Sequence, residues 1–192
     1  MRYRDGRRSV CLSSQSMLNL DSVLAAARRL PDLGVTHRRT TVPTVGWLPG
    51  LRRFVDEVEE PVRLALSLHA PDDALRSELM PMNERYPLAE IVHQCTRYFA
   101  LRRRRVFVEY VLLRGVNDRV AQARELVALL DRRIFKVNLI PYNPTGAYEG
   151  STRKVIAAFK DVLDRARLPA TVRLTRGRDI EAACGQLAAT RA

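Results

Sequence analysis

The chain of 192 residues is 46% hydrophobic, which excludes a disordered polypeptide and is enough to bury one well-formed core. Its 33 lysines and arginines against 21 aspartates and glutamates give a formal net charge of +12, which suits a polyanionic partner such as RNA but is also what an arginine-rich genome produces. Neither a secretory signal nor an apolar run of membrane-spanning length is seen, so we expect a cytoplasmic protein with no membrane partner.

Segments of strand and helix character alternate along the chain. Asp21 is predicted to cap the first helix, and the helix over 87–101 carries one apolar stripe, made of Leu88, Ile91, Val92, Cys95 and Phe99. The predicted order is strand 9–12, helix 22–30, strand 38–45, helix 49–58, strand 62–69, helix 87–101, strand 106–113, helix 119–131, strand 134–142, helix 152–166 and strand 171–175. Such alternation predicts an α/β fold with a parallel sheet and right-handed crossovers.

The faces of the predicted strands favour a barrel over an open sheet. In the strand 62–69, one face is apolar, with Val62, Leu64, Leu66 and Leu68, and the other face carries small or polar residues. The next two strands place Glu109, Lys136 and Asn138 among apolar neighbours. Polar side chains inside parallel strands are costly unless they meet a ligand or a partner, which a barrel lumen provides.

Two of these strands end abruptly in proline and short polar residues. Ser67, Leu68 and His69 precede Pro71, and Asn143 lies between Pro141 and Pro144. The carboxyl-terminal strand ends of a barrel carry its site, so these side chains are candidates for binding a small polar ligand. The alternatives are that His69 is a satisfied loop histidine and Asn143 an ordinary turn residue.

One cysteine, Cys184, follows a charged turn near the end of the sequence. Arg176 and Arg178 and a predicted helix start near Asp179 would stabilise its thiolate, so it is a candidate nucleophile. The alternative is a small buried residue that closes a helix. The chain has three cysteines, which form no C-x-x-C pair and no cluster able to hold zinc or iron and sulfide, and this spacing fits a reducing compartment.

Four segments together carry a resemblance to a known family. They are 64–73 (LALSLHAPDD), 109–118 (EYVLLRGVND), 136–144 (KVNLIPYNP) and 176–187 (RGRDIEAACGQL). In this order they resemble the C-terminal part of the radical S-adenosylmethionine methyltransferases that modify adenine C2 or C8 of 23S ribosomal RNA, the RlmN/Cfr family. The resemblance runs from about Leu18 to the C-terminus and implies an incomplete radical-SAM (β/α)6-type partial barrel with outer helices.

The resemblance assigns roles to the candidate residues. It implies that Ser67, Leu68, His69 and Asn143 bind S-adenosylmethionine and that Cys184 is the cysteine that carries a methyl group to the base. The implied cofactors are S-adenosylmethionine and a [4Fe–4S] cluster. The implied partners are 23S rRNA, with tRNA as a second candidate, and the arginines would contact phosphates.

The departures from the family bear on activity. The C-x-x-x-C-x-x-C motif that supplies three cluster ligands is absent from these 192 residues, and Ser14, Gln15 and Ser16 stand where the family has Gly-Glu-Pro. Pro43 replaces an expected serine. We therefore expect a divergent segment at 1–17 before a barrel part at 18–192.

Three readings of the function remain open from the sequence. The chain is a truncated methyltransferase that is inactive alone, a subunit completed by a separate cluster-binding chain that corresponds to a missing N-terminal half, or a non-catalytic basic RNA-binding protein. Whether it is an enzyme is left undecided.

Overall fold

Six parallel strands form one sheet in the computed structural model, which describes residues 10–11, 17–143 and 147–173. Each strand pairs with the next one along the chain, so the order in the sheet is the order in the sequence. The strands are β1 (Val10–Cys11), β2 (Thr40–Thr44), β3 (Arg63–Ser67), β4 (Val106–Leu112), β5 (Phe135–Pro141) and β6 (Ala170–Val172).

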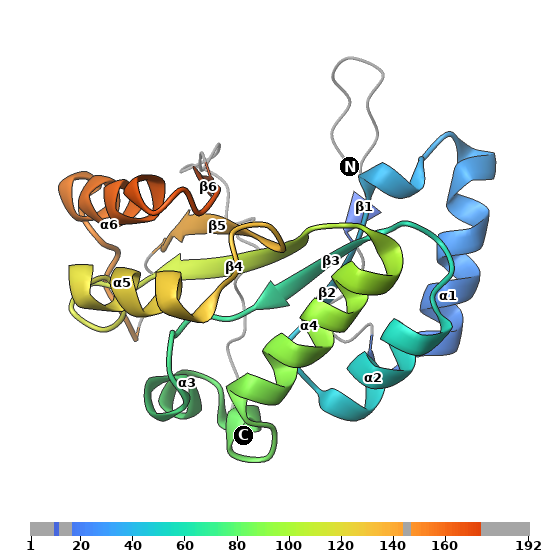
Figure 1. Ribbon diagram of the computed structural model, residues 1–192, viewed down its shortest axis with the longest axis horizontal. Helices are drawn as coiled ribbons and strands as arrows, with labels where there is room; N and C mark the ends of the chain where they lie inside the picture. Colours follow the sequence, from blue (N-terminus) through green and yellow to red (C-terminus); the bar gives the residue numbers. More distant parts are fainter. Residues whose placement is uncertain (1–9, 12–16, 144–146, 174–192) are drawn as a thin grey trace.

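Helices connect the strands and cover the outside of the sheet (Figure 1). They are α1 (Leu20–Arg29), α2 (Leu48–Glu57), α3 (Asp73–Leu79), α4 (Leu88–Arg102), α5 (Val120–Leu129) and α6 (Arg153–Arg165), with 3-10 turns η1 (Leu30–Leu33), η2 (His37–Arg39) and η3 (Pro81–Glu84). Right-handed crossovers between strands that follow one another in order place the crossover helices on the same face of a sheet. The expected partial barrel with parallel strands and outer helices is confirmed.

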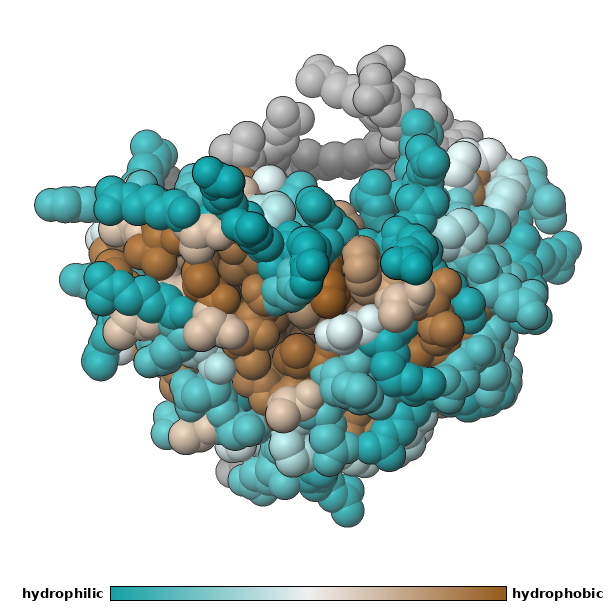
Figure 2. Space-filling model, viewed as in Figure 1, coloured by the Kyte–Doolittle hydropathy of each residue, from teal (hydrophilic) through white to brown (hydrophobic). Residues whose placement is uncertain are grey.

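The core lies between the strands and these helices. As predicted, Val62, Leu64, Leu66 and Leu68 share one face, and each is 0% exposed. Strands β4 and β5 alternate in the same way, with buried residues facing the helices and half-buried ones on the concave face. Figure 2 shows hydrophobic residues gathered in the centre and left of one face of the molecule, surrounded by hydrophilic residues.

The apolar stripe of α4 differs from the prediction at two of its five positions. Leu88, Ile91 and Cys95 are buried as expected, but Tyr98 completes the stripe, whereas Val92 and Phe99 are only half-buried. The Tyr98 ring stacks on Phe54 of α2 at 5.8 Å between centroids, and its hydroxyl donates to the Val62 carbonyl. A tyrosine can be buried here because this carbonyl accepts its proton.

Two predicted helix details were wrong or incomplete. Helix α1 begins at Leu20, so Asp21 lies in its first turn rather than at the cap, and the Asp21 carboxylate pairs with Arg53 of α2. The predicted elements also omit α3, whose N-cap is Asp72; the Asp72 side chain accepts the Leu75 N–H at 2.9 Å. Helix α3 supplies a residue on which the candidate site depends.

No helix in the described ranges is both long and apolar enough to span a membrane. Residues 1–9 and 12–16 lie outside the described part, so the boundary expected between 17 and 18 stays a prediction.

Candidate cofactor-binding site

A row of polar side chains crosses the concave face of the sheet. The strand register aligns Ser67 of β3 with Glu109 of β4, Asn138 of β5 and Thr171 of β6. Asn138 Nδ2 lies 3.3 Å from both Glu109 carboxylate oxygens, and Thr171 Oγ1 donates to Asn138 Oδ1 at 2.6 Å. The polar strand residues noticed in the sequence therefore satisfy one another across three strands.

The Glu109 carboxylate is the acidic group of this row. Burial raises its pKa, while the Asn138 amide and the positive charge of Arg173 act in the opposite direction. A carboxylate that accepts only one long amide contact retains free lone pairs. Glu109 can therefore accept further hydrogen bonds from a ligand on the concave face.

The loop after β3 holds His69 in an unusual backbone conformation. Its φ of 62° lies in the left-handed region, which histidine adopts more readily than most residues but still rarely. The His69 carbonyl accepts from Asn117 Nδ2 at 2.8 Å, and the ring Nδ1 accepts from the Val111 N–H at 3.2 Å. Main chain and ring are thus both fixed against the end of β4.

This environment also sets the charge and tautomer of the His69 ring. Burial lowers its pKa to about 4, and the nearby Arg76 guanidinium adds to this effect. The ring is therefore neutral at pH 7. Because Nδ1 accepts a backbone proton, the ring proton resides on Nε2, which is the atom able to donate to a ligand.

The buried side chain of Arg76, in α3, is hydrogen-bonded to the carboxyl ends of β2 and β3. Its side chain, 1% exposed, donates to the carbonyls of Ser67, Leu68 and Val45 at 2.8–3.2 Å. A fourth bond, at 2.6 Å, goes to Asn83 Oδ1. Burial lowers the Arg76 pKa to about 10, so the guanidinium stays charged at pH 7. One buried cation therefore joins the ends of β2 and β3 to α3.

Asn117 plays the corresponding part at the end of β4. It is 0% exposed, and its Oδ1 accepts the Leu113 N–H at 2.7 Å while its Nδ2 donates to the carbonyls of His69 and Val111. Its own carbonyl accepts from the Tyr110 hydroxyl at 2.9 Å. The Asn117 side chain links the ends of β3 and β4. Its burial is tolerated because each of its polar atoms has a hydrogen-bond partner.

The loop after β5 is tied to the loop after β4. Ser151 Oγ donates to Asp118 Oδ2 at 2.7 Å, and Gly150 forms an antiparallel bridge with Leu113. A Cβ on Gly150 would lie 2.6 Å from the Tyr142 carbonyl oxygen, so the close approach requires glycine. Asn143 is half-buried at the start of this loop.

The candidate residues from the sequence have different outcomes. Ser67 and His69 lie at the carboxyl end of β3 and Asn143 at that of β5, with β4 between them, and Ser67 Oγ forms no hydrogen bond within the described ranges. The Leu68 side chain is buried on the helix side, and its N–H already donates to the Glu109 carbonyl. Cys184 lies outside the described residues. All four site assignments and that of Cys184 remain predictions.

Sequence reasoning missed the two residues that hold this edge together. Nothing in the sequence indicated that Arg76 is buried, because an arginine in the mostly polar run 72–78 is expected to be exposed to solvent. Asn117 stands inside the segment 109–118, but its position there gives no sign that its amide is buried. The only available hint for α3 was Asp72 as a cap before a short helix-forming run.

Comparison with known proteins gives two close relatives. The dual-specificity RNA methyltransferase RlmN of Pseudomonas fluorescens (strain SBW25) is 43% identical over 180 residues, which are 90% of this chain and 47% of the relative. A probable dual-specificity RNA methyltransferase RlmN of Parafrankia sp. (strain EAN1pec) is 47% identical over 182 residues, 91% of this chain and 47% of that protein. No protein-family model matches the chain.

Two solved structures resemble the fold. A radical SAM methyltransferase from Sphaerobacter thermophilus matches with a TM-score of 0.83 and 43% identity, over 89% of this chain and 51% of that one. A domain of a pyruvate-formate lyase-activating enzyme from Bacteroides vulgatus ATCC 8482 matches with a TM-score of 0.63 over 86% of this chain and 99% of that one. At 17% identity, the second match bears on the fold alone.

The chain is therefore a homologue of the RlmN radical SAM methyltransferases, and it spans about half the length of the curated relatives it matches.

Proposed function

We propose that this chain binds S-adenosylmethionine at the carboxyl ends of β3, β4 and β5, as part of a methyltransferase that acts on adenine in 23S rRNA, with tRNA as a second candidate substrate. Ser67, His69 and Asn143 would hold the cofactor. Cys184 would carry the methyl group. The homology to RlmN over half its length supports the substrate class.

The observation that carries the proposal is the neutral donor set at the strand ends. The Ser67 hydroxyl, the Asn143 amide and the Nε2–H of a neutral His69 offer hydrogen bonds without adding charge. S-adenosylmethionine has an adenine edge, ribose hydroxyls and a carboxylate, each of which needs fixed polar partners. A few placed polar groups at the mouth of a barrel suit such a ligand.

A binding measurement tests the proposal. Isothermal calorimetry with S-adenosylmethionine and with S-adenosylhomocysteine should detect one site on the chain. The variant His69→Ala should bind about five- to tenfold more weakly, because one good hydrogen bond is worth about 1–1.5 kcal/mol. His93→Ala is the matched control, because His93 is exposed on α4 and should leave the affinity unchanged.

Two results would count against this assignment. One is the absence of cofactor binding by the folded wild-type chain. The other is an unchanged affinity in His69→Ala. The variant His69→Asn separates ring chemistry from backbone strain, because asparagine tolerates the left-handed conformation but lacks the Nε2 donor.

The second candidate is a subunit that works with a separate cluster-binding chain. The donor set of the described residues does not fit a [4Fe–4S] cluster, which is held by neighbouring cysteine thiolates. Cys95 is a free cysteine buried in the core, where burial raises its pKa to about 12. Within the described ranges no group of three cysteine, histidine or acidic residues is placed to bind a metal ion. The cluster ligands would have to come from elsewhere.

A further inference from the structure

The positive charge of the described chain is concentrated at one end of the sheet. We name as the amino edge the segments 37–40, 58–63, 102–106, 130–135 and 164–170, which precede or open strands β2 to β6. These segments contain eleven arginines and four carboxylates. Those before β2 to β5 alone contain nine arginines and three carboxylates, whereas the described segments that follow the same four strands contain two arginines, Arg114 and Arg119, and three carboxylates.

This asymmetry is not what compositional bias alone predicts. A genome-wide preference for arginine would raise the number of arginines at both ends of the strands. Around β2 to β5, within the described residues, the excess lies at the end of the strands opposite the candidate cofactor site. A substrate that approached only the carboxyl ends would therefore leave most of the excess charge unused.

Some arginines of the amino edge have an acidic partner within the chain: Arg133 pairs with Asp131 and Arg165 pairs with Asp161. At the amino edge, Arg103, Arg105 and Arg132 are exposed and form no ion pair with any other described residue. Their charges are therefore available to a partner.

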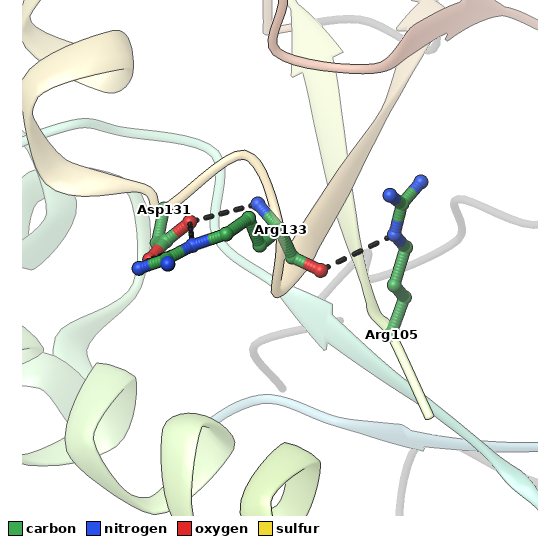
Figure 3. A network of polar contacts seen from close by, with 3 residues as sticks. All are labelled: Arg105, Asp131 and Arg133. Atoms are coloured by element: carbon green, nitrogen blue, oxygen red, sulfur yellow. Dashed lines mark hydrogen bonds and ion pairs between the residues drawn. The ribbon is translucent and has the colours of Figure 1, made fainter. Parts of the chain in front are cut away.

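One part of the amino edge is held in a fixed geometry (Figure 3). Arg105, before β4, donates from Nε to the Arg133 carbonyl at 3.2 Å, and Arg133, before β5, pairs with Asp131 at 2.8 Å. Only the inner nitrogen of Arg105 is used in this bond, and the two outer nitrogens point away from the loop. Ordering an arginine beforehand lowers the entropy lost when it binds a ligand.

The same edge has unsatisfied polar groups. In the described part of the chain, the buried side-chain polar atoms without a hydrogen-bond partner are His37 Nε2, Glu60 Oε2 and Arg102 Nε. They precede β2, β3 and β4 respectively. Because these atoms are buried, a ligand from solution does not reach them, and only the exposed arginines of this edge can contact a partner directly.

We propose that the amino edge is a second RNA-binding surface, which contacts phosphates at the end of the barrel opposite the cofactor site. The guanidinium fork matches phosphate oxygens. Arginines precede successive strands of one sheet, so they form a row along its edge that an extended polyanion can follow. The inference rests on the proposed function only in taking RNA as the polyanion.

This surface would position RNA without reading its sequence, because phosphate contacts carry no base information. A structured RNA that touches both the amino edge and the mouth of the barrel would gain affinity over a short single strand that reaches only the mouth. The amino edge would then favour large folded RNAs.

The test compares two triple variants with equal loss of charge. Arg103→Gln, Arg105→Gln and Arg132→Gln remove three of the eleven arginine charges of the amino edge. Arg85→Gln, Arg124→Gln and Arg153→Gln are the matched control, because these three are exposed residues outside that edge. Fluorescence anisotropy with a labelled RNA hairpin of about 20 base pairs measures affinity across a series of salt concentrations.

The amino-edge variant should lose at least about tenfold in affinity at moderate salt. Its plot of log affinity against log salt should become shallower by about 2 to 3, since each lost phosphate contact releases roughly one counterion fewer. The control should change by less than about twofold in affinity. Equal losses in both triple variants, or no loss in the amino-edge variant, would overturn the proposal.

Two further measurements separate this inference from the others. In calorimetry, the amino-edge triple variant and the wild type should bind S-adenosylmethionine with the same affinity. If neither binds it while the RNA result holds, the proposed function is wrong and the RNA-binding surface is supported. Vesicles with anionic phosphatidylglycerol should bind weakly. Vesicle binding as tight as that of the RNA hairpin, and equally dependent on the amino edge, would contradict RNA as the partner.

Discussion

At the scale of single residues, His69 combines three constraints in one position. Its backbone is left-handed, its Nδ1 accepts a main-chain proton and its carbonyl accepts from Asn117. Backbone outliers of this kind persist only when the surroundings over-determine them, and they cluster at binding sites. The contacts around His69 offset the energy cost of its left-handed backbone. As a result, a neutral imidazole with its proton on Nε2 is held at the strand ends.

The lowered pKa of His69 predicts how stability depends on pH. The folded pKa of about 4 lies below the ordinary value of 6.5, so between these values the unfolded chain binds the proton and the folded chain does not. This contribution is complete above pH 6.5 and is lost as the pH falls toward 4, by up to roughly 3 kcal/mol. Urea unfolding measured from pH 4 to 7 checks this slope.

The variant His69→Asn is the control for that measurement. It should flatten the pH dependence between 4 and 6.5, because asparagine does not titrate. Glu109 acts in the opposite direction: burial raises its pKa, so it stabilises the fold at low pH and loses that contribution as the pH rises. Identical slopes in wild type and variant would show that His69 is not the responsible group.

At the scale of elements, α4 ends at a residue with a left-handed backbone. Arg103 is its C-cap, with φ of 53° and its N–H donating to the Phe99 carbonyl. Glycine is favoured at this place because it has no Cβ to strain. Arginine here has the strain of a left-handed backbone, while its positive charge interacts favourably with the carboxyl-terminal end of the helix dipole.

Replacing Arg103 with glycine should therefore stabilise the fold. We expect a gain of about 0.5–1 kcal/mol, from relief of the left-handed strain less the entropy that glycine adds to the unfolded chain. Thermal unfolding should show a midpoint raised by about 1–3 °C. Arg102→Gly, inside the last turn of α4, should lower the midpoint instead, because glycine is unfavourable within a helix. A lower midpoint for Arg103→Gly would contradict this account.

At the scale of the whole molecule, the site and the charge lie at opposite ends of the sheet. The carboxyl ends carry the neutral donor set, and the amino edge carries the arginine excess. In a parallel sheet these two ends are separated by the length of the strands. Cofactor binding should therefore be nearly independent of salt, whereas RNA binding should not.

The positions of the cysteines predict whether these 192 residues alone can assemble an iron–sulfur cluster. Anaerobic reconstitution with iron and sulfide should yield no [4Fe–4S] absorbance, since three neighbouring thiolates are needed and Cys95 is sealed in the core. Adding a polypeptide with a C-x-x-x-C-x-x-C motif should allow a cluster to form, and this mixture is the positive control. A stoichiometric cluster on the chain alone would refute the expectation.

Much of the site could be predicted because its signals are local. Ser67 and His69 end a strand and precede Pro71, and a strand end next to proline can be seen in one segment of sequence. The supports could not be predicted in this way. Arg76 is buried because carbonyls from two strands and Asn83 converge on it, and no property of its neighbours in sequence indicates that convergence.

The sequence by itself determined the order of the elements and the face that each strand buries, because alternation with period two and the helical period act over a few neighbouring residues. Tertiary structure alone decided that Tyr98 rather than Phe99 enters the core, that His69 is neutral and that the arginines before successive strands gather at one edge. These depend on which atoms lie close in space, through burial, hydrogen-bond partners and summed charge, and only the packed sheet brings those atoms together.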